Sequence, residues 1–495
     1  GIELDDCCVQ AALAFKEEGI ETIMVNSNPE TVSTDFDVSD KLYFEPIVAE
    51  DVLEIIRHEN PYGVVVQFGG QTPLKLTDEL TKNNVKILGT SPESIDIAEN
   101  REKFKHFLSE FNFKQPENRT ATNKSEAQNA MDELGFPVIV RPSYVLGGRA
   151  MELINTQLDL DNYINNKIVL SKENPLLIEK FLDDAVEIDI DLICDGTDAV
   201  VGGVLQHIEE AGIHSGDSSC SFPPYSVSDT QLHKLKKEIK AVAKKLNVCG
   251  LMNAQVAVKG NDFYMIEVNP RASRTIPFLS KCIGVSLAKN ASKAILGKSL
   301  NDLGINSEIM PTSYAVKAPV FPFNKFRKVD PILGPEMKST GEVMGRGTTF
   351  GEAFGKAMRG AGDVIPNQGN VFVSVKNSDK KYLPELCSKL IKLGFSIVAT
   401  KGTGKYLTEK NINHEQINKV LEGRPHIVDA ILNKEICMVI NTTEGRQSIK
   451  DSFSIRRSAL EQSVFFTTTI SGGLAIVESL EKGEQNWSYI ALQDS

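Results

Sequence analysis

The sequence lacks the features that mark membrane proteins and nucleic-acid-binding proteins. No stretch approaches the roughly 18 apolar residues of a membrane span, and no signal peptide opens the chain, so we expect no membrane role. The chain also has no run of lysine or arginine, and its 54 basic and 66 acidic residues give a net charge of −12. Because bulk nucleic-acid binding relies on neutralising phosphates, we expect no nucleic-acid partner.

Cysteine pairs of the CxxC type are also missing from the eight cysteines of the chain. Cys7 and Cys8 are neighbours in an apolar helical pattern, where cysteine usually acts as a small core residue. This usage predicts a reducing, cytoplasmic compartment. The chain begins at Gly1 with no initiator methionine, which favours a piece cut from a longer protein.

The length of 495 residues exceeds one ordinary core, and domain-size statistics predict about three or four units. In the first ninety residues, a helical spacing of apolar side chains ends at Gly19, and short buried strands follow in TIMVN, GVVVQFGG and VKILGT. These patterns predict a parallel α/β unit. The polar segments NSNPETVSTD and QFGGQTP either line a site at the strand ends or only make turns.

From residue 95 the pattern changes to longer helices and antiparallel strand pairs. FPVIVRPSYVLGGRAMELI predicts two strands joined by a loop, in which Gly147 and Gly148 either let backbone N–H groups approach phosphate or form a plain hairpin turn. Further on, Glu187, Asp189 and Asp191 alternate with apolar residues and therefore share one strand face. We expect Asp189 and Asp191 to face solvent, whereas Glu187 either joins them or meets a ribose.

A hairpin is predicted in GLMNAQVAVKGNDFYMIEVNPR, with a three-residue turn at Gly260. One face is apolar and must pack on the core; the other ends in three amides and a carboxylate. The predicted core face holds Ala254, Val256, Val258, Tyr264, Ile266 and Val268. The predicted cross-strand pairs are Lys259 with Phe263, Gln255 with Glu267 and Asn253 with Asn269.

The polar end of this hairpin suits a hard cation such as Mg²⁺, which takes one or two carboxylates and fills its other positions with water and phosphate oxygens. The alternative is a strand end whose side chains bond to solvent. Arg271 and Arg274 lie beyond the strand, where they either clamp a small anion or phosphoryl group, or pair with the surrounding acids.

The segment HIEEAGIHSGDSSCS holds five ionisable residues among its glycines and serines. We expect a nucleotide and substrate loop here. Zinc is the alternative, although no cysteine or third histidine completes a regular ligand pattern. The five residues are His207, Glu209, Glu210, His214 and Asp217.

Taken in order, Arg141, the Gly147–Gly148 loop, Glu187, Gln255, Glu267 and Asn269 resemble an ATP-grasp enzyme. More narrowly, the chain resembles the C-terminal half of the large subunit of carbamoyl phosphate synthetase, from Gly1 to its end. The motifs that carry this resemblance are RPSYVLGGRAM, FLDDAVE, EEAGIHSGDS, EVNPRASRT and GPEMKSTGEVMG.

The resemblance implies an α/β fold in four parts. Residues 1–94 would form a Rossmann-like pre-ATP-grasp domain, and residues 95–300 an ATP-grasp α+β domain. Residues 301–362 would form a helical connector. Residues 363–495 would form a doubly wound α/β regulatory domain of methylglyoxal-synthase type.

The activity implied is phosphorylation of carbamate by ATP with Mg²⁺ or Mn²⁺, giving carbamoyl phosphate and ADP, with K⁺ as a further ion. This is the second synthetic step of glutamine-dependent carbamoyl phosphate synthesis, which serves pyrimidine and arginine biosynthesis. The implied partners are the N-terminal synthetic half, a glutaminase small subunit and further copies in an oligomer. The alternatives are another ATP-grasp ligase such as a biotin carboxylase, or a regulatory and assembly fragment that is inactive alone.

The resemblance also implies roles for individual residues. Arg271 and Arg274 match the arginines at the reacting anion, and Gln255, Glu267 and Asn269 match the metal ligands. Gln255 and Glu267 would also contact ATP. The remaining nucleotide-binding residues would be Arg141, Lys180 through its backbone, Leu182, Glu187, Gly212, Ile213, His214 and Ser215.

The C-terminal part returns to alternating strands and helices, with threonine and glycine at several strand ends. These residue types suit a phosphate site, although each is also common in turns. The resemblance implies that Lys380, Thr400, Thr403, Lys419, Asn441 and Thr443 bind a nucleotide monophosphate effector. Glu209 and Asp217 match contacts for ornithine, but Ala318 stands where ornithine-activated relatives carry an acid, which leaves ornithine activation in doubt.

Overall fold

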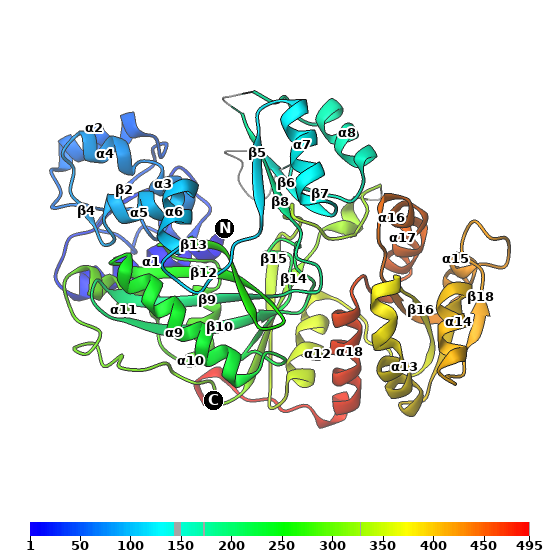
Figure 1. Ribbon diagram of the computed structural model, residues 1–495. Coiled ribbons are helices and arrows are strands. Elements are labelled where there is room, and N and C mark those ends of the chain that lie inside the picture. The colour runs from blue at the N-terminus through cyan, green and yellow to red at the C-terminus, as the bar shows by residue number, and fades with distance from the viewer. Residues whose placement is uncertain (143–149, 172–173, 327, 495) are drawn as a thin grey trace.

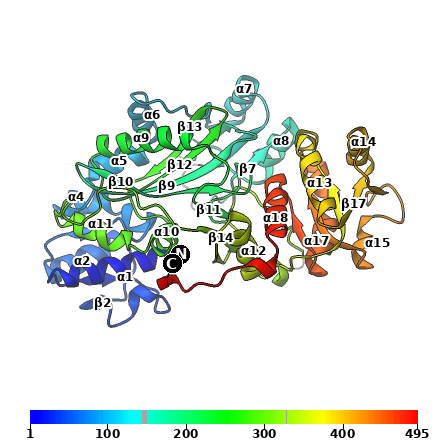
Figure 2. The same ribbon diagram turned by 90° about the horizontal axis from the view of Figure 1, so that it is seen from below.

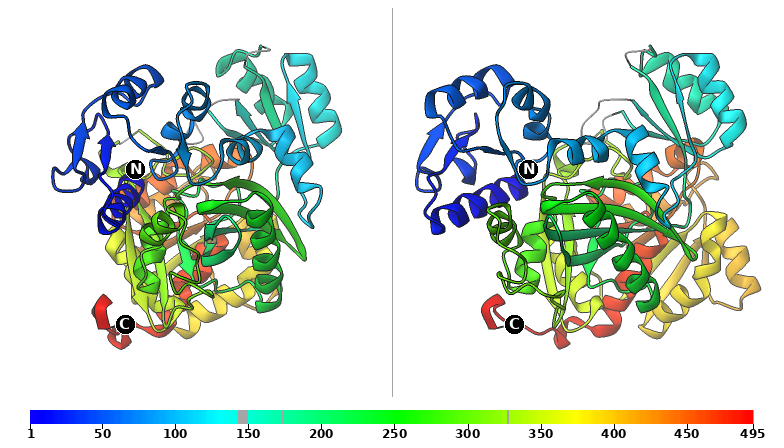
Figure 3. Two further views of the ribbon diagram at one scale, coloured as in Figure 1. Left: turned by 90° about the vertical axis from the view of Figure 1, so that its left-hand side faces the viewer. Right: turned by 60° about the vertical axis from the view of Figure 1, so that its left-hand side comes forward.

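The computed structural model describes residues 1–142, 150–171, 174–326 and 328–494. A seven-stranded sheet lies at the centre (Figure 1). The N-terminal unit and a four-stranded unit rise from the same side of it, and a parallel five-stranded sheet stands at one end (Figure 3). Within the described ranges, no helix is both long and apolar enough to cross a membrane.

The N-terminal unit begins with α1 (Ile2–Glu17), and Gly19 follows it with a φ of +75°, a conformation that favours glycine. Its strands are only two or three residues long and pair in parallel, as predicted, but in two separate pairs. These are β1 (Ile23–Val25) with β2 (Lys41–Tyr43), and β3 (Val64–Val65) with β4 (Ile87–Leu88). The other helices are η1 (Val32–Thr34), α2 (Ala49–Glu59), α3 (Gln71–Leu74), α4 (Thr77–Lys82), α5 (Pro92–Glu99) and α6 (Arg101–Leu108).

The four-stranded unit is antiparallel and has the strand order β5-β8-β6-β7. The two strands predicted on either side of Gly147 and Gly148 are confirmed as β6 and β7, and the glycine pair itself lies outside the described residues. The strands are β5 (Asn118–Ala121), β6 (Val138–Pro142), β7 (Glu152–Ile154) and β8 (Leu176–Lys180), with α7 (Lys124–Leu134) and α8 (Gln157–Asn166).

The central sheet is antiparallel, with the order β13-β12-β9-β10-β11-β14-β15. Apolar side chains of α9 and α6 pack on one face, whereas α10, α11 and α1 contribute to the core on the other face. Its strands are β9 (Val186–Asp195), β10 (Ala199–His207), β11 (Cys220–Phe222), β12 (Cys249–Lys259), β13 (Asp262–Asn269), β14 (Tyr314–Val320) and β15 (Gly341–Gly347). Its helices are α9 (Asp229–Lys245), α10 (Ile276–Ile283) and α11 (Leu287–Ile295).

The expectation of a helical connector over residues 301–362 is wrong in its secondary structure. Two strands of this segment, β14 and β15, extend the central sheet, because β14 pairs with β11 and then with β15. Apart from the short η2 (Phe323–Lys325), its helix is α12 (Phe350–Ala361), which packs on β14 and β15. The segment therefore completes one sheet and begins the contact with the next domain.

The C-terminal domain is a parallel sheet with the order β18-β17-β16-β19-β20 and apolar cores on both faces, which confirms a doubly wound fold. Helices α12 and α18 lie between it and the central sheet (Figure 2). Its strands are β16 (Gly369–Ser374), β17 (Phe395–Thr400), β18 (Glu415–Ile417), β19 (Ile436–Asn441) and β20 (Phe465–Thr467). Its helices are η3 (Asn377–Tyr382), α13 (Leu383–Lys392), α14 (Lys401–Glu409), α15 (Ile427–Leu432), α16 (Arg446–Asp451), α17 (Phe453–Glu461) and α18 (Ile470–Lys482), followed by η4 (Glu484–Asn486) and η5 (Leu492–Asp494).

Close packing of α12 on β15 gives a first prediction. A Cβ on Gly345 would lie 2.1 Å from the carbonyl oxygen of Ala353 and 2.4 Å from the amide nitrogen of Ala357, so Gly345→Ala must displace the helix backbone. We expect a loss of about 1–3 kcal/mol in the free energy of unfolding, measured by denaturant titration. Gly341→Ala is the control in the same strand, because its Cβ would meet no described atom within 4 Å. Equal stability of the two variants would contradict this packing.

Candidate functional site

The hairpin of β12 and β13 carries a dense group of polar side chains. The predicted register is confirmed at its far end, where Asn253 lies opposite Asn269 and Gln255 opposite Glu267. The register is wrong near the turn. There Lys259 pairs with Asp262, so the turn has two residues and not three.

A β-bulge after Gln255 reconciles the two registers, because Ile266 of β13 has no opposite residue. Beyond the bulge each side chain of β13 changes face. Phe263 and Met265 are therefore buried in the core, whereas Ile266 is 40% exposed and Tyr264 is half-buried. The prediction that Tyr264 and Ile266 belong to the core face is wrong for this reason.

The polar end of the hairpin brings one carboxylate and three amides together on adjacent strands. Asn253 and Asn269 are buried, and Gln255 and Glu267 are half-buried. The Asn269 side-chain amide donates to Glu267 Oε1 at 2.8 Å. Side-chain oxygens of these types are ligands for Mg²⁺, so the donor set fits the ion that the sequence predicts.

The side chain of Asp191 on β9 links the polar end of the hairpin to the segment that follows β13. The carboxylate is completely buried and accepts hydrogen bonds from Asn253 Nδ2 at 3.0 Å, from Ser273 Oγ at 2.7 Å and from the Thr275 hydroxyl. Burial raises the pKa of Asp191 to about 6, against the effect of these hydrogen bonds. The expectation that Asp191 faces solvent is wrong, since the segment after β13 folds back over it.

Asp189 is buried too, so the same expectation is wrong for it. Its Oδ2 lies 2.8 Å from His207 Nε2, and His207 Nδ1 lies 3.3 Å from Glu187 Oε2. Burial alone would raise the pKa of Asp189, but the hydrogen bond and charge of His207 outweigh it and lower that pKa. Burial would likewise lower the pKa of His207, whose neighbours Cys220, Asp189 and Glu187 instead raise it. The imidazole of His207 thus connects β10 to two carboxylates of β9.

Arg271 and Arg274 follow β13 and lie at this end of the sheet. Arg271 donates from Nη2 to Asn269 Oδ1 at 3.0 Å and from Nη1 to the carbonyl of Ala272 at 2.9 Å. Arg274 Nη1 lies 2.7 Å from Met337 Sδ. Within the described part of the chain neither arginine forms an ion pair. Burial lowers the pKa of Arg271, and the nearby charges of Glu267 and Glu99 oppose this effect.

Two glutamines of the N-terminal unit contact the segment after β13, and sequence reasoning missed both. Gln67 is fully buried, and its side chain donates from Nε2 to the carbonyl of Pro270 at 2.9 Å. The backbone carbonyl of Gln67 accepts from Ala272 N at 2.8 Å. Gln71 Oε1 accepts from Arg271 Nε at 3.3 Å. The available signal was their position after β3, in QFGGQTP, which the sequence marks as a possible site.

The loop predicted to hold nucleotide lies beside β9. Glu187 Oε1 accepts from Gly212 N at 3.1 Å, and His214 N donates to the carbonyl of Gly334 at 2.9 Å. The carbonyl of Ser215 lies 3.5 Å from Lys317 Nζ, and Ile213 is half-buried within this loop. Burial, followed by the charge of Arg274, lowers the pKa of His214 and favours a neutral imidazole.

The other predicted nucleotide residues lie in and after the four-stranded unit. Lys180 Nζ donates to the carbonyls of Gly135 at 3.2 Å and Phe136 at 3.1 Å. Because the side chain is engaged there, any contact of Lys180 with nucleotide would come from its backbone. Arg141 Nη2 lies 3.8 Å from Glu179 Oε2 on the neighbouring strand. Leu182 belongs to a small apolar cluster with Ala185, Ala211, Ala257 and Tyr264.

The ionisable loop does not gather into a zinc site. His207 lies between carboxylates, whereas His214 Nδ1 accepts from Gly216 N at 3.0 Å. Across the described ranges, no group of three or more His, Cys, Asp and Glu side chains is arranged to hold a metal ion. Glu210 instead lies 3.0 Å from Lys376 Nζ of the C-terminal domain.

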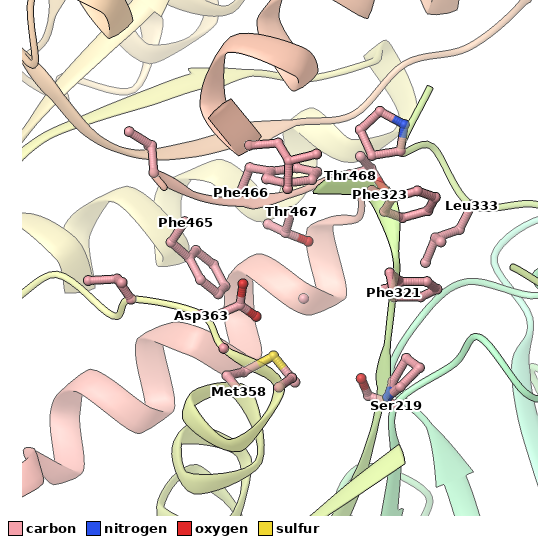
Figure 4. Close-up of a pocket in the computed structure, with 18 of the residues that line it drawn as sticks. Ser219, Phe321, Phe323, Leu333, Met358, Asp363, Phe465, Phe466, Thr467 and Thr468 are labelled. Carbon is pink, nitrogen blue, oxygen red and sulfur yellow. The ribbon is translucent and has the colours of Figure 1, made fainter. Parts of the chain in front are cut away.

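A cavity of about 220 Å³ lies between the end of β14 and the C-terminal domain (Figure 4). Phe321 and Phe323 line it from one side, and Phe465 and Phe466 from the other. Glu209 is also part of the lining, and burial raises its pKa to about 7. The cavity therefore combines phenylalanine side chains with polar groups, among them the carboxyl groups of Glu209 and Asp363.

Asp217 does not share this environment. Its two carboxylate oxygens accept from the backbone N–H groups of Lys338 at 2.8 Å and Ser339 at 2.9 Å, and the side chain is completely buried. Ala318 is also buried and packs in the core between the domains. Asp217 thus fixes the backbone at Lys338 and Ser339. The side chain of Ala318 has no negative charge with which to bind the amine of an ornithine ligand.

The six residues expected to bind a nucleotide monophosphate all lie at or after the carboxyl ends of neighbouring parallel strands. Thr400 ends β17, where its Oγ1 lies 3.0 Å from Ser374 Oγ at the end of β16. Asn441 ends β19, and its buried Nδ2 has no partner among the described residues. The others are Thr403 in α14, Thr443 after β19, Lys380 in η3 and Lys419 after β18.

Family models match three consecutive parts of the chain. Residues 1–97 match the carbamoyl phosphate synthase preATP-grasp domain, and residues 100–303 match the ATP-binding domain of the carbamoyl phosphate synthase L chain. Residues 383–468 match an MGS-like domain.

Curated relatives match along nearly the whole chain. The carbamoyl phosphate synthase large chain of Pseudomonas syringae pv. tomato is 55% identical over 485 residues, which are 98% of this chain and 45% of the relative. The chain belongs to the carbamoyl phosphate synthase large-chain family. The large chain of Vibrio vulnificus is 54% identical over 96% of this chain and 44% of its own length. The resemblance stated from the sequence is confirmed, and the chain spans about half the length of the curated family members it matches.

Solved structures of more distant proteins share the fold. The biotin carboxylase domain of Hydrogenobacter thermophilus 2-oxoglutarate carboxylase, solved with MgADP and bicarbonate, has a TM-score of 0.57 at 16% identity, covering 72% of this chain and 86% of that chain. N5-carboxyaminoimidazole ribonucleotide synthetase from Thermus thermophilus has a TM-score of 0.55 at 16% identity, covering 71% and 95%. These likenesses show an ATP-grasp fold that the family shares with other enzymes.

The buried network around Asp191 gives a second prediction. Asp191→Ala leaves three buried donors without their acceptor, on Asn253, Ser273 and Thr275. The variant also no longer buries a charged carboxylate, which offsets part of this cost. We expect a net loss of about 2–4 kcal/mol in the free energy of unfolding. Asp198→Ala is the control, because that exposed carboxylate only pairs with Lys244 at the surface and should cost less than about 0.5 kcal/mol. Equal losses in chemical denaturation would contradict the bracing role.

Proposed function

We propose that the chain catalyses phosphorylation of carbamate by MgATP, giving carbamoyl phosphate and ADP. The observation that carries this proposal is the arrangement of Glu267 and Asn269 on one strand with Gln255 opposite, directly before two arginines, in a chain of this family. Phosphoryl transfer needs alignment of the reactants and neutralisation of charge more than covalent help from the protein.

The hairpin would supply the metal-binding half of the site. Gln255, Glu267 and Asn269 have the oxygen donors for Mg²⁺ or Mn²⁺, and the ion when bound would neutralise charge on the ATP phosphates. Arg141, Lys180, Leu182, Glu187 and the Gly212–Ser215 loop would hold the nucleotide. Glu187 already orders that loop through Gly212, and the apolar cluster around Leu182 suits an aromatic base. K⁺ would be a further ion.

Arg271 and Arg274 would supply the anion-binding half. Both guanidinium groups are free of carboxylate partners in the described part of the chain, so their charge is available to an anion. Hydrogen bonds to Asn269 and Gln71 set the direction of Arg271. Because carbamate decomposes in water, this reaction would also require that the site exclude solvent while the reactants are bound.

The whole-protein context is part of the proposal, because the chain spans only about half of its relatives. The other half of a large chain would supply carbamate, and a glutaminase small subunit would supply ammonia. Pyrimidine and arginine biosynthesis would use the product, in the cytoplasm, with the chains assembled as an oligomer. The domain limits proposed are residues 1–94, 95–300, 301–362 and 363–495.

A third prediction tests the activity directly. The chain should form ATP from carbamoyl phosphate and MgADP, measured with a coupled luminescence assay. Glu267→Gln keeps the size of the side chain but removes the charge expected to hold the ion, so we expect a loss of at least about 100-fold in kcat/KM. Glu133→Gln, at an exposed ion pair of α7, should leave the rate unchanged.

No ATP formation by a folded sample would refute an activity of this piece alone. ATP hydrolysis stimulated by biotin would instead indicate a biotin carboxylase, whose fold is similar. Binding of effector without binding of MgATP would indicate a regulatory and assembly fragment.

We also infer that the C-terminal domain binds a nucleotide monophosphate at the carboxyl ends of β16, β17 and β19. Thr400 is the N-cap residue of α14 but makes no side-chain capping bond, so the first N–H groups of this helix are open to an anion. The buried amide of Asn441 lacks a partner at the same edge. Lys380 and Lys419 would add positive charge. The proposed ornithine contacts Glu209 and Asp217 have less support, since Asp217 already accepts two backbone N–H groups.

A fourth prediction follows for this effector site. Thr400→Val keeps the shape of the side chain and removes its hydroxyl, so we expect nucleoside monophosphates to bind at least about 10-fold more weakly in calorimetry. Thr408→Val is the matched control on α14, because that hydroxyl donates only to the carbonyl of Gly404 in its own helix. Unchanged affinity in Thr400→Val would argue against a phosphate site at this edge.

A further inference from the structure

Arg456 is a guanidinium of α17 with no exposed surface, and it reaches out of the C-terminal domain. It binds Asp330 through two hydrogen bonds, one of them from Nε to Oδ1 at 2.7 Å, and it donates from Nη2 to the carbonyl of Ile449 at 2.7 Å. Asp330 lies in the connection between β14 and β15, which belong to the central sheet. A bidentate ion pair therefore joins the two domains at this connection.

The ion pair fixes the first residue of the segment 330–339. Asp330 Oδ1 also accepts from Ile332 N at 3.1 Å, so the same carboxylate sets the direction of the chain that follows. Farther along, Lys338 Nζ donates back to the carbonyl of Ile332 at 2.5 Å. The segment thus has its own internal bonds, and Arg456 attaches it to the C-terminal domain by an ion pair beside the cavity that Pro331 and Leu333 help to line.

The far end of this segment holds the loop of His214. The carbonyl of Gly334 accepts from His214 N at 2.9 Å. Asp217 accepts from the N–H groups of Lys338 and Ser339, and Ser339 Oγ donates to the carbonyl of Gly216 at 2.9 Å. These bonds tie each end of the 214–217 loop to the segment 330–339.

The same segment also contacts Arg274 directly. Met337 Sδ lies 2.7 Å from Arg274 Nη1. Gly216 lies in the middle of this contact, since a Cβ there would be 3.2 Å from Arg274 Nη1, from His214 Nδ1 and from Met337 Cε. There is little room for Arg274 to move unless the segment moves with it.

We propose that Arg456 is a positioning residue for phosphoryl transfer, acting on Arg274 and on the His214 loop through the segment 330–339. The proposal rests on the proposed function for its catalytic consequence. A buried ion pair adds little net stability over a well-packed apolar pair, but it restricts geometry. Arg456 also leaves its buried Nη1 without a partner among the described residues, which indicates that the pair is not optimised for stability.

The first test measures hydrogen–deuterium exchange and does not depend on activity. In Arg456→Met, which removes the charge and keeps an apolar stem, the amides of His214, Lys338 and Ser339 should exchange at least about 10-fold faster. Amides of the central strands β9 and β12 serve as an internal reference. Arg424→Met is the matched control, because Arg424 is an exposed arginine of the same domain that pairs with Asp429.

Asp330→Asn is the second variant, in case Arg456→Met does not fold. The amide of Asn keeps the size of the carboxyl group and an oxygen that can still accept one hydrogen bond from the buried guanidinium, so this variant weakens the pair without leaving Arg456 unpartnered. It should raise exchange at the same three amides. Unchanged exchange at His214, Lys338 and Ser339 in a folded variant would overturn the proposal, whether or not the chain makes ATP.

The second test separates positioning from general destabilisation by a double-mutant cycle in the ATP-forming assay. Arg456→Met should lower kcat about 10-fold in the natural chain but less than about 2-fold in an Arg274→Lys background, because the two changes act through one group. The same factor in both backgrounds would overturn the role of Arg274 as the target. If the natural chain made no ATP, the proposed function would fail and the exchange measurement would still decide whether Arg456 orders the segment.

Discussion

The buried carboxylate of Asp191 is the interaction on which the candidate site depends. It joins Asn253 on β12 to Ser273 and Thr275 after β13, and so turns the chain that carries both arginines back over the sheet. Arg271, at the start of this segment, donates to Asn269 Oδ1. Burying this charge is costly because the carboxylate loses its contact with water, and the three donors around it offset part of that cost.

Local pattern was sufficient to predict much of the site. Strand period and a turn signal correctly placed Gln255 beside Glu267 and Asn253 beside Asn269. Two errors cancelled in this prediction. The predicted turn was one residue too long, and the bulge at Ile266, which was not predicted, restores the register at the far end. A bulge depends on how the whole sheet twists and packs, and nothing in the alternation of apolar residues marks it. For this reason the prediction that Tyr264 and Ile266 lie on the core face was wrong, although the predicted pairs of polar residues were right.

Contacts between distant parts of the chain could not be predicted in this way. Asp189 and Asp191 look like a solvated face until the segment after β13 and the imidazole of His207 cover them. Gln67 supports Pro270 from about two hundred residues away, and no local signal links the two. The resemblance implied a helical connector where β14 and β15 lie, and the sequence does not show that β11 leaves an edge to which β14 can pair. In each case tertiary pairing decided what local preference left open.

If the C-terminal domain binds the proposed effector, its influence on the candidate site would pass through loops, because closely packed sheets do not deform gradually. Among the described residues, Lys381 pairs with Asp184 across the two domains, and two further ion pairs connect them next to the nucleotide loop. Lys376, the residue directly before η3, pairs with Glu210, while Arg456 pairs with Asp330 of the segment 330–339. The loop of His214 lies between these two attachments, so a shift of the C-terminal domain would change both together. Regulation and catalysis would then share one small set of backbone hydrogen bonds, at His214, Lys338 and Ser339, whose strength depends on the placement of a neighbouring domain.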